Sequence, residues 1–396
     1  MENYQATLNR LDAFTPADFK GHEVERLHLL DTARKLLARL ETIEERVYNL
    51  TFHPPTLYAA MKTCVDLGIW RGWMAVGGGE KSLKELAELA DKDCDLNLLR
   101  RLLRLLSASN IIEETGEDRY KPTPLSLALG DKSSPIPLAT VAKTYLWDPS
   151  LINLPLFLAK TSYREPEDAK YTNINDGTPE GLTFFERNET KKIYQDTFSA
   201  YMDMWIAYRL PWPQFYDTTA LLNGADLSAG PLIVDIGGHH GHDLLRVLDK
   251  HPNLPDGSLV IQDLPEVLTD SKLSTPKIKL MPHSFFDVEP VHGSRAYFFH
   301  GIFHDWPDAT AIQILRNLIP AMKKGYSKLL ICDVVLPPTG TNIYQATMDI
   351  NMMAHLSAYE RSESRWRKLI TEAGFNVIKI WMDARRYEGV IEAELA

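Results

Sequence analysis

The chain has 396 residues, 44% of them hydrophobic and 24% charged, which indicates a folded globular protein with room for two or three domains. Its formal net charge of −10 disfavours a general nucleic-acid binder, because phosphate neutralisation needs clustered Lys and Arg, and favours a small-molecule partner. The N-terminus lacks a signal-peptide pattern and no run approaches about 18 uncharged apolar residues, so we expect a cytoplasmic protein without a membrane segment.

The N-terminal part, residues 1–135, is predicted to be helical and to carry a winged helix. Apolar residues recur at three- and four-residue steps over Val24–Leu50, which predicts one long amphipathic helix that needs a partner. A second helical pattern begins at Thr56 and ends in a glycine-containing turn. Residues Ser82–Gly130 then predict helix, turn, helix and a two-stranded wing around Glu114–Asp118.

A winged helix has two interpretations here. It either binds DNA through the helix Leu96–Ser107, as a regulator with a vestigial catalytic domain would, or it serves packing and dimer contact. Apart from leucines, that helix offers only Arg100, Arg101 and Arg104. These are few side chains for contacts to bases and phosphates in a DNA groove. The sequence therefore favours packing, with no nucleic-acid partner and a homodimer formed through the N-terminal apolar stripe.

Residues 136–225 are rich in aromatic residues and methionine, among them Tyr145, Trp147, Phe184, Tyr201 and Trp205. Most such side chains belong to a core, but a helical connector of this composition also suits the wall of a pocket for a flat organic substrate.

From residue 226 to 396 the pattern changes to an α/β domain. Short β-rich apolar runs (PLIVDIGG, SLVIQDL, RAYFFHGI and KLLICDVVL) alternate with helical stretches such as HDLLRVLDKH, which predicts a mostly parallel, Rossmann-like sheet. The three cysteines, Cys64, Cys94 and Cys332, are not paired at ligand spacing, so we expect buried apolar side chains and no metal site.

Ligands of such sheets lie beyond the carboxyl ends of the strands, where this chain places several polar residues. Asp235 ends the first strand before the glycine turn, and Asp263 ends the second strand, where an acid can accept hydrogen bonds from ribose hydroxyls. At the end of a later strand stand His300 and His304. The latter is suited to act as a general base or hydrogen-bond donor, with Asp333 and Glu360 orienting it or balancing its charge.

The order of winged helix, VDIGG turn, QDLPEV, HDWPD, DVVLP and YERSESRWRKLITEAGF resembles the fungal branch of the S-adenosylmethionine-dependent O-methyltransferases, which are related to the plant caffeate type. The resemblance covers nearly the whole chain. It implies an N-terminal dimerisation region and a Rossmann-like class I methyltransferase domain for S-adenosylmethionine (SAM). It also implies that His304 is the general base, and that Asp333 and Glu360 are the acids flanking it, Asp333 being shorter than the usual Glu.

For the cofactor, the resemblance assigns Asp263 to the ribose and the turn residues Asp235, Gly237 and Gly241 to the methionine part. Gly238, in the same turn, is a further candidate cofactor-binding residue. Two positions depart from the pattern. His239 stands where the middle glycine belongs, so that an imidazole meets the cofactor where backbone normally does.

Ser284 stands where an acid usually contacts the adenosine. Overpacking costs about 1–3 kcal/mol and a lost hydrogen bond to a charged group about 1.5–3 kcal/mol, which together would weaken binding roughly 10² to 10⁴-fold. The alternative is that the turn shifts, His239 points outward and SAM binds as usual.

Two functions remain open from the sequence. In the first, the enzyme requires no cofactor and steers a dehydration or pericyclic cyclisation of a polyketide-type or aromatic substrate, as repurposed members of this fold do in fungal pathways. In the second, it is an active SAM-dependent O-methyltransferase of a phenolic or enolic molecule, with His304 as base. Both use His304, Asp333, Glu360 and His300 at the polar end of one aromatic pocket.

Overall fold

The computed structural model describes residues 2–269 and 273–396, and the chain divides into two units, Met1–Val141 and Ala142–Ala396. The boundary lies near the first predicted division, whereas the predicted division at residue 225 falls inside the second unit. The first unit contains α1 Glu2–Asp12, η1 Pro16–Phe19, α2 Glu23–Leu40, α3 Ile43–Thr51, α4 His53–Asp66, α5 Ile69–Ala75, β1 Lys81–Ser82, α6 Leu83–Glu88, α7 Leu96–Ala108, β2 Ile112–Gly116, β3 Arg119–Pro122, α8 Pro124–Ala128 and most of α9 Ile136–Ala142.

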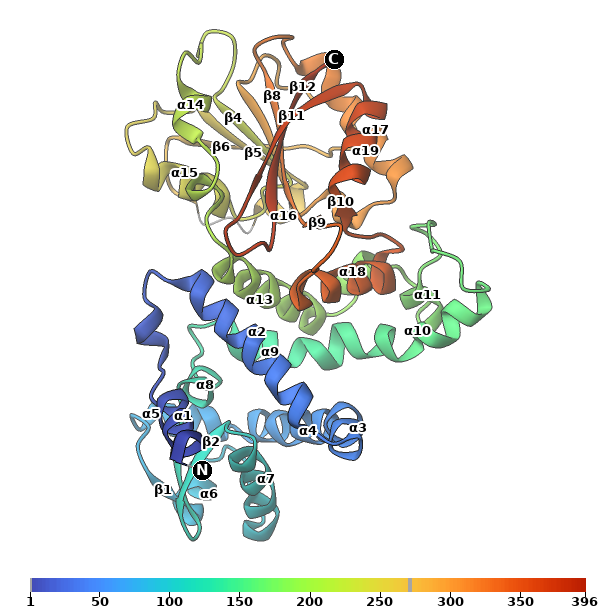
Figure 1. The fold of residues 1–396 in the computed structure, drawn as a ribbon. Coiled ribbons are helices and arrows are strands. Elements are labelled where there is room, and N and C mark those ends of the chain that lie inside the picture. The colour runs from blue at the N-terminus through green and yellow to red at the C-terminus, as the bar shows by residue number, and fades with distance from the viewer. Residues whose placement is uncertain (1, 270–272) are drawn as a thin grey trace. The chain divides into compact units, whose positions relative to one another are not determined.

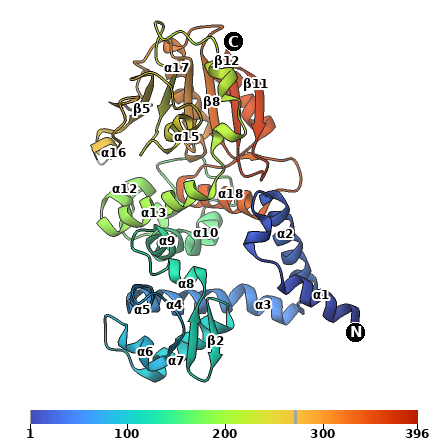
Figure 2. The same ribbon diagram turned by 90° about the vertical axis from the view of Figure 1, so that its left-hand side faces the viewer.

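The predicted winged helix is present in this unit. Its strands lie in the order β1-β3-β2, and β2 lies beside α7 (Figure 2). Leu99, Leu103 and Leu106 of α7 are fully buried against Ile112 and Tyr120, because a three- and four-residue spacing places them on one helix face.

The arginine that begins the second turn of α7 is engaged within the winged helix itself. The guanidinium of Arg100 donates two hydrogen bonds to Asp118, at 2.7 and 2.8 Å. It therefore ties the helix to the loop between the two wing strands, which agrees with a packing role for this helix.

The prediction of one continuous helix over Val24–Leu50 is wrong, because α2 ends at Leu40 and α3 begins at Ile43. Thr42 stops the first helix and starts the second: its side chain accepts from the backbone N–H of Glu45, whose carboxylate accepts from the backbone N–H of Thr42. Neither helix buries a residue, and Leu40 and Ile43 are 71% and 80% exposed. The homodimer through these helices stays a prediction.

The second unit begins with helices and continues as an α/β domain. Its elements are η2 Lys143–Trp147, α10 Asp148–Lys160, α11 Asn173–Gly177, α12 Phe184–Glu189, α13 Lys192–Tyr208, η3 Trp212–Gln214, α14 Thr218–Leu222, β4 Ile233–Ile236, α15 His242–Lys250, β5 Leu259–Asp263, α16 Pro265–Thr269, β6 Ile278–Pro282, β7 Ala296–His300, η4 Phe303–Asp305, α17 Asp308–Leu318, η5 Ile319–Ala321, β8 Lys328–Asp333, β9 Val335–Leu336, α18 Ile343–Leu356, β10 Arg361–Ser362, α19 Glu363–Ala373, β11 Phe375–Met382 and β12 Gly389–Leu395.

The predicted sheet has seven strands in the order β11-β12-β8-β7-β4-β5-β6, and only β12 runs antiparallel to its neighbours. Helices cover both faces, α17 and α19 on one and α14 and α15 on the other (Figure 1). This arrangement confirms the Rossmann-like class, since parallel strands joined by crossover helices must be covered on both sides.

Successive side chains along each strand point to opposite faces of the sheet, and so pack against different helices. In β7, Tyr297 and Phe299 pack toward α17 and α19, whereas Ala296 and Phe298 pack toward α15. Because side chains alternate with a period of two, Asp235, His300 and Cys332 also point to the α15 side of their strands. The strand ends therefore deliver a carboxyl, an imidazole and a thiol to one face.

The cysteines lie largely as predicted, with Cys64 and Cys332 buried, Cys94 half-buried, and all three free. Within the described residues, no helix combines the length and apolar character that a membrane crossing requires.

We expect Leu330→Ala in β8 to destabilise the protein by about 2–5 kcal/mol, because Leu330 is fully buried between the sheet and α15 and its truncation leaves a cavity. Leu280→Ala is the matched control, since Leu280 on the edge strand β6 is 40% exposed. Urea unfolding of both variants measures the difference. Equal losses of stability would contradict this account of the core.

Candidate functional site

One cavity of about 470 Å³ lies within the second unit, at the carboxyl ends of the sheet strands. Its apolar wall comes from the helices of the predicted connector and from α18, and its polar wall comes from the glycine turn and the loops after β5, β6 and β7. The main apolar lining residues are Trp147, Phe184, Phe185, Phe198, Tyr201, Met202, Trp205, Ile206, Met348, Met352 and Leu356. An aromatic and methionine-rich wall of this kind suits a flat, largely uncharged organic molecule.

His304 lies between this cavity and two buried acids. Its Nδ1 is 3.0 Å from the Glu360 carboxylate and 3.6 Å from that of Asp333, and both acids are almost fully buried behind it. Its Nε2 is 3.5 Å from Asp305 and lies on the side of Gly301, where the glycine leaves room that a side chain would take. The structure thus brings together the three residues predicted as a catalytic group, and leaves Nε2 as the ring nitrogen available to a ligand.

The acids around His304 hold it in the protonated state. Burial alone would lower the pKa of the imidazole, but the carboxylates of Asp333, Glu360 and Asp305 outweigh burial and raise the pKa of His304 to about 10. An imidazolium has no free lone pair at either nitrogen, so at neutral pH the resting side chain is a hydrogen-bond and proton donor.

Asp305 is a site residue that the sequence did not single out. Burial and the neighbouring acids raise its pKa to about 7 although His304 acts to lower it, so that near neutrality it exists in both the acid and the carboxylate form. It lines the cavity, whereas Asp333 and Glu360 do not. The HDWPD segment drew attention to the histidine, and its first aspartate could have been found as the ionisable residue directly beside that histidine.

A fully buried arginine holds the loop that carries His304. The guanidinium of Arg361 donates to the carbonyl oxygens of Phe303 and Trp306, at 2.6 and 2.7 Å, and its Nε donates to Asp308 at 2.8 Å. In β10, Arg361 pairs in parallel with Val335 of β9. This short pairing places Glu360, which precedes β10, beside Asp333, which ends β8.

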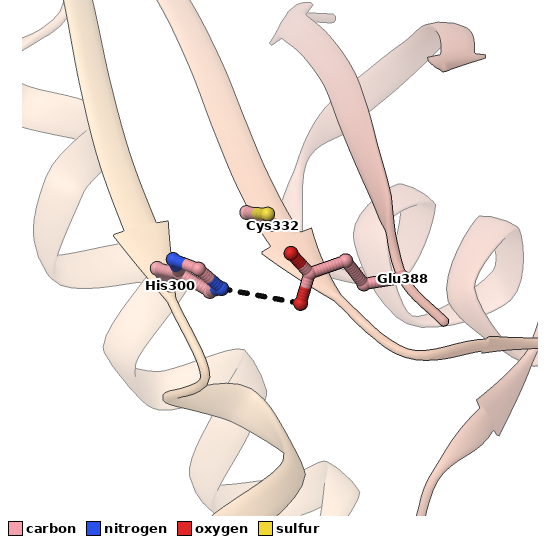
Figure 3. A group of neighbouring side chains, drawn as sticks. All are labelled: His300, Cys332 and Glu388. Carbon is pink, nitrogen blue, oxygen red and sulfur yellow. Dashed lines mark hydrogen bonds and ion pairs between the residues drawn. The ribbon is translucent and has the colours of Figure 1, made fainter. Parts of the chain in front are cut away.

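His300 belongs to a second charged group on the α15 side of the sheet. Its Nδ1 is 2.7 Å from Asp243 of α15, and its Nε2 is 3.3 Å from Glu388, which precedes β12 (Figure 3). Glu388 also forms an ion pair with the buried Arg209, which follows α13 and stacks 4.3 Å from the Trp205 ring. His300 thus lines the same cavity as His304, and its own polar partners are residues that the sequence reasoning missed.

Two groups of described residues each place three possible metal-binding side chains close together: His300, Cys332 and Glu388 (Figure 3), and His304 with Asp333 and Glu360. A cation does not fit the first group, because the Arg209 guanidinium already supplies positive charge 2.8 Å from the His300 Nε2. In the second group, the carboxylates of Glu360 and Asp333 face the same ring nitrogen of His304, Nδ1, at 3.0 and 3.6 Å.

The glycine turn keeps the shape that a nucleotide site requires. Gly237 and Gly241 have φ of +76°, and a side chain at Gly237 would run into Ile302. A side chain at Gly238 would lie 2.7 Å from the Asp235 carboxyl. One oxygen of that buried carboxyl, Oδ2, has no hydrogen-bond partner among the described residues. The turn and this orphaned oxygen fit the amino-acid part of SAM.

His239 adopts the backbone conformation of the glycine it replaces. Its φ is +46°, in the left-handed region, so the turn has not shifted away to relieve the substitution. Its ring lines the cavity and lies 3.8 Å from the ring of His240 between centroids. Burial, with His240 and His242 nearby, lowers its pKa to about 4, so His239 presents a neutral ring to the cavity.

The two remaining predicted cofactor residues, Asp263 and Ser284, also line the cavity. Asp263 accepts the backbone N–H of His239 at Oδ2, 2.9 Å away, and that of Leu264 at Oδ1, 2.8 Å away. Each carboxyl oxygen retains a second lone pair, which a ribose hydroxyl can use. Ser284 accepts from the backbone N–H of Phe286 at 3.3 Å, so its hydroxyl hydrogen stays available for donation.

A family model for an O-methyltransferase domain matches residues 211–376. The curated O-methyltransferase ATR12 of Stachybotrys chlorohalonatus is 45% identical over 396 residues and is covered completely, as is this chain. The chain belongs to the O-methyltransferase family. A further family member, O-methyltransferase mfmE of Annulohypoxylon moriforme, is 34% identical over 98% of this chain and 94% of its own length.

Solved structures of this fold include one described as a pericyclic reaction enzyme. LepI in complex with SAM is 26% identical, with a TM-score of 0.89 over 99% of this chain and 100% of its own. A structure described as a pericyclic reaction enzyme is also 26% identical, with a TM-score of 0.87 over the whole of both chains. The family and fold predicted from the sequence are thereby confirmed.

We expect His239→Gly to strengthen SAM binding roughly tenfold or more, because it removes a ring from the cavity wall of this O-methyltransferase-family protein. It should also stabilise the fold by about 1 kcal/mol, since glycine adopts a positive φ without strain. Calorimetric titration and thermal unfolding measure the two effects. His240→Ala is the control, because His240 lies beside the turn but does not line the cavity; an unchanged affinity in His239→Gly would refute the steric argument.

The charge on His304 can be observed directly. We expect its ring to remain protonated as the pH rises past neutrality and to lose the proton only near pH 10, because its folded-state pKa is raised to about 10. Nitrogen NMR of histidine-labelled protein follows the titration, with His304→Gln assigning the signal. A midpoint near the ordinary histidine value of about 6.5 would show that the acids do not hold this proton.

Proposed function

We propose that this chain is an enzyme of fungal secondary metabolism that uses the O-methyltransferase fold to catalyse dehydration or pericyclic cyclisation, of the Diels–Alder or Alder-ene type, on a polyketide-derived substrate without methyl transfer. The observation that carries the proposal is the setting of His304, whose ring lines the aromatic cavity with carboxylates of Glu360, Asp305 and Asp333 at 3.0, 3.5 and 3.6 Å. A histidine held protonated at the mouth of an aromatic cavity is prepared to donate a proton or a hydrogen bond, and must lose that proton before it can act as a base.

The His304 and Asp305 pair supplies the proton transfers of a dehydration. Nε2–H of His304 gives its proton to the departing hydroxyl, the carbon–oxygen bond breaks with its electrons passing to oxygen, and water leaves. The carboxylate form of Asp305, 3.5 Å from the same nitrogen, accepts the proton lost from the neighbouring substrate carbon. Proton exchange between the two side chains then restores the starting state.

The same arrangement supports a ring closure after the dehydration. The apolar wall confines a reactive chain near the conformer that closes, which removes part of the entropic barrier. A hydrogen bond from His304 to a conjugated carbonyl withdraws electron density and stabilises charge that develops on that oxygen. Neither effect consumes a group donor, so the reaction needs no methyl source.

The relatives support this proposal in part. LepI and the structure described as a pericyclic reaction enzyme are alike to this chain over almost its full length. LepI was solved with SAM, so seating SAM in this fold is compatible with such a neighbour. The proposed reaction itself requires no cofactor, whether or not SAM is bound.

A second candidate is methyl transfer to a phenol or enol, favoured by the orphaned Asp235 oxygen, the preserved glycine turn and two relatives named O-methyltransferases. SAM, when bound, supplies the methyl group. His304 would remove the proton from the attacking oxygen, with Glu360 and Asp333 stabilising the imidazolium that results. This role requires the deprotonated ring, which the same two acids disfavour.

The pH dependence of the rate distinguishes the two reactions. If His304 donates, activity rises as Asp305 ionises near pH 7 and falls as His304 loses its proton near pH 10. If His304 is the base of a methyl transfer, activity keeps rising toward pH 10. Polyketide-type alcohols and phenols are assayed by mass spectrometry with and without SAM. A product heavier by one methyl, formed only with SAM, would overturn the proposed cyclisation.

His304→Gln should lower the rate on the order of 100-fold or more, because glutamine keeps a hydrogen-bond donor but carries no transferable proton. His251→Gln, whose ring contacts Thr218 away from the cavity lining, is the matched control and should retain activity. Retention of full activity by His304→Gln would remove this residue from the mechanism.

A further inference from the structure

His355 places a further imidazole in the cavity wall, with polar partners that differ from those of His304. It lies in the last turn of α18, is 1% exposed, and lines the cavity together with Trp147 and Phe184. The planes of these two rings lie at 10° to one another and at 88° and 79° to the imidazole, with centroids 5.1 and 5.4 Å from it. His355 is therefore a polar group set in the aromatic part of the wall.

Both ring nitrogens of His355 face backbone carbonyl oxygens. Nδ1 lies 2.8 Å from the oxygen of Asn351, one turn earlier in α18, and Nε2 lies 3.3 Å from the oxygen of Leu146 in η2. A neutral imidazole carries one proton, so it can donate to only one of two acceptors. The shorter contact assigns that proton to Nδ1, which leaves the lone pair of Nε2 beside the lone pairs of the Leu146 carbonyl.

The surroundings of His355 keep its ring neutral. Within the described part of the chain its nitrogens contact carbonyl oxygens and no carboxylate, whereas three acids surround His304. Burial and the nearby charge of Arg187 outweigh the two carbonyls and lower the pKa of His355 to about 4. Arg187 itself is held in place, because its Nη1 donates to the carbonyl of Tyr145 at 2.7 Å. At neutral pH no second proton therefore bridges Nε2 and Leu146.

Two hydrogen-bond acceptors thus meet at this part of the wall without a donor between them. A buried acceptor that lacks a donor costs free energy, and a ligand that brings one to Nε2 removes that cost. The rings of Trp147 and Phe184 beside the imidazole favour an aryl group there, because aromatic rings pack well in offset and edge-to-face arrangements. A phenolic hydroxyl meets both requirements, since it joins an O–H donor to an aromatic ring.

We propose that Nε2 of His355, beside the Leu146 carbonyl, accepts a hydrogen bond from a phenolic hydroxyl of the substrate, a hydroxyl other than the oxygen that reacts at His304. The substrate class is a flat molecule with a hydroxylated aromatic ring that packs against Trp147 and Phe184. His355 determines specificity and takes no part in the proton transfers. The inference deepens the proposed function and rests on it for the identity of the reacting oxygen, but it concerns binding and is tested by binding.

The test uses two flat probes, 4-hydroxychalcone and 4-fluorochalcone, which share a conjugated carbonyl and differ because fluorine replaces the hydroxyl. Calorimetry at pH 7 measures both affinities. Wild-type protein should prefer the hydroxylated probe roughly five- to tenfold, as one hydrogen bond provides. His355→Phe keeps a ring without the acceptor and should abolish the preference. His355→Gln, whose amide oxygen can accept in place of Nε2, should retain most of it. Met352→Leu, on the same wall of α18, is the matched control and should leave the preference unchanged.

The preference between the probes is the readout, because a merely structural loss at His355 would weaken both probes alike. Equal binding of the two probes by wild-type protein, no binding of either, or a preference that persists in His355→Phe would overturn the proposal. Nitrogen NMR of the free protein at pH 7 should find the His355 proton on Nδ1, and a proton on Nε2 would also overturn it. This measurement and His355→Gln keep the test decisive if His355→Phe does not fold. Each outcome is independent of the reaction at His304, so the proposed cyclisation stands or fails separately.

Discussion

The buried guanidinium of Arg361 is the contact on which the site depends. It donates hydrogen bonds to two loop carbonyls and an aspartate of the segment that carries His304. Its own strand, β10, pairs with β9. A guanidinium presents its donors in a rigid plane, so the loop and strand cannot slide past one another without leaving buried donors unpaired. The distance between His304 and Glu360 is therefore set by the fold and does not wait for a ligand.

The cavity that results has apolar walls and two separate charged ends. At one end three acids share one imidazolium, and at the other an aspartate is held ionised by His300 and Arg246. Charges in such surroundings act strongly because little water screens them. In the proposed reaction the first end faces an oxygen of the reacting molecule, and the second lies at the glycine turn, where His300 and Arg209 also line the cavity.

Sequence patterns predicted the elements whose signals are local. The strands that carry Asp235 and Asp263 follow from apolar runs bounded by glycine or an acid, and the HDWPD segment identified His304. Asp243, Arg209 and Glu388 were missed because they come from α15, the end of α13 and the start of β12, and meet only when the sheet is assembled. Likewise the apolar stripe of the N-terminal helices continued across Thr42, where capping overrode periodicity.

The hydrogen bonds of Asp263 bear on the speed of recognition. Both of its oxygens already hold backbone amides of the turn and of the following loop, so this corner is assembled in the free protein. Because this part of the chain is already ordered, binding of a ligand here costs little conformational entropy of the protein. We therefore expect affinity to depend mainly on a slow dissociation rate and less on a fast association rate. With such a preformed turn, nucleosides would differ more in their dissociation rates than in their association rates.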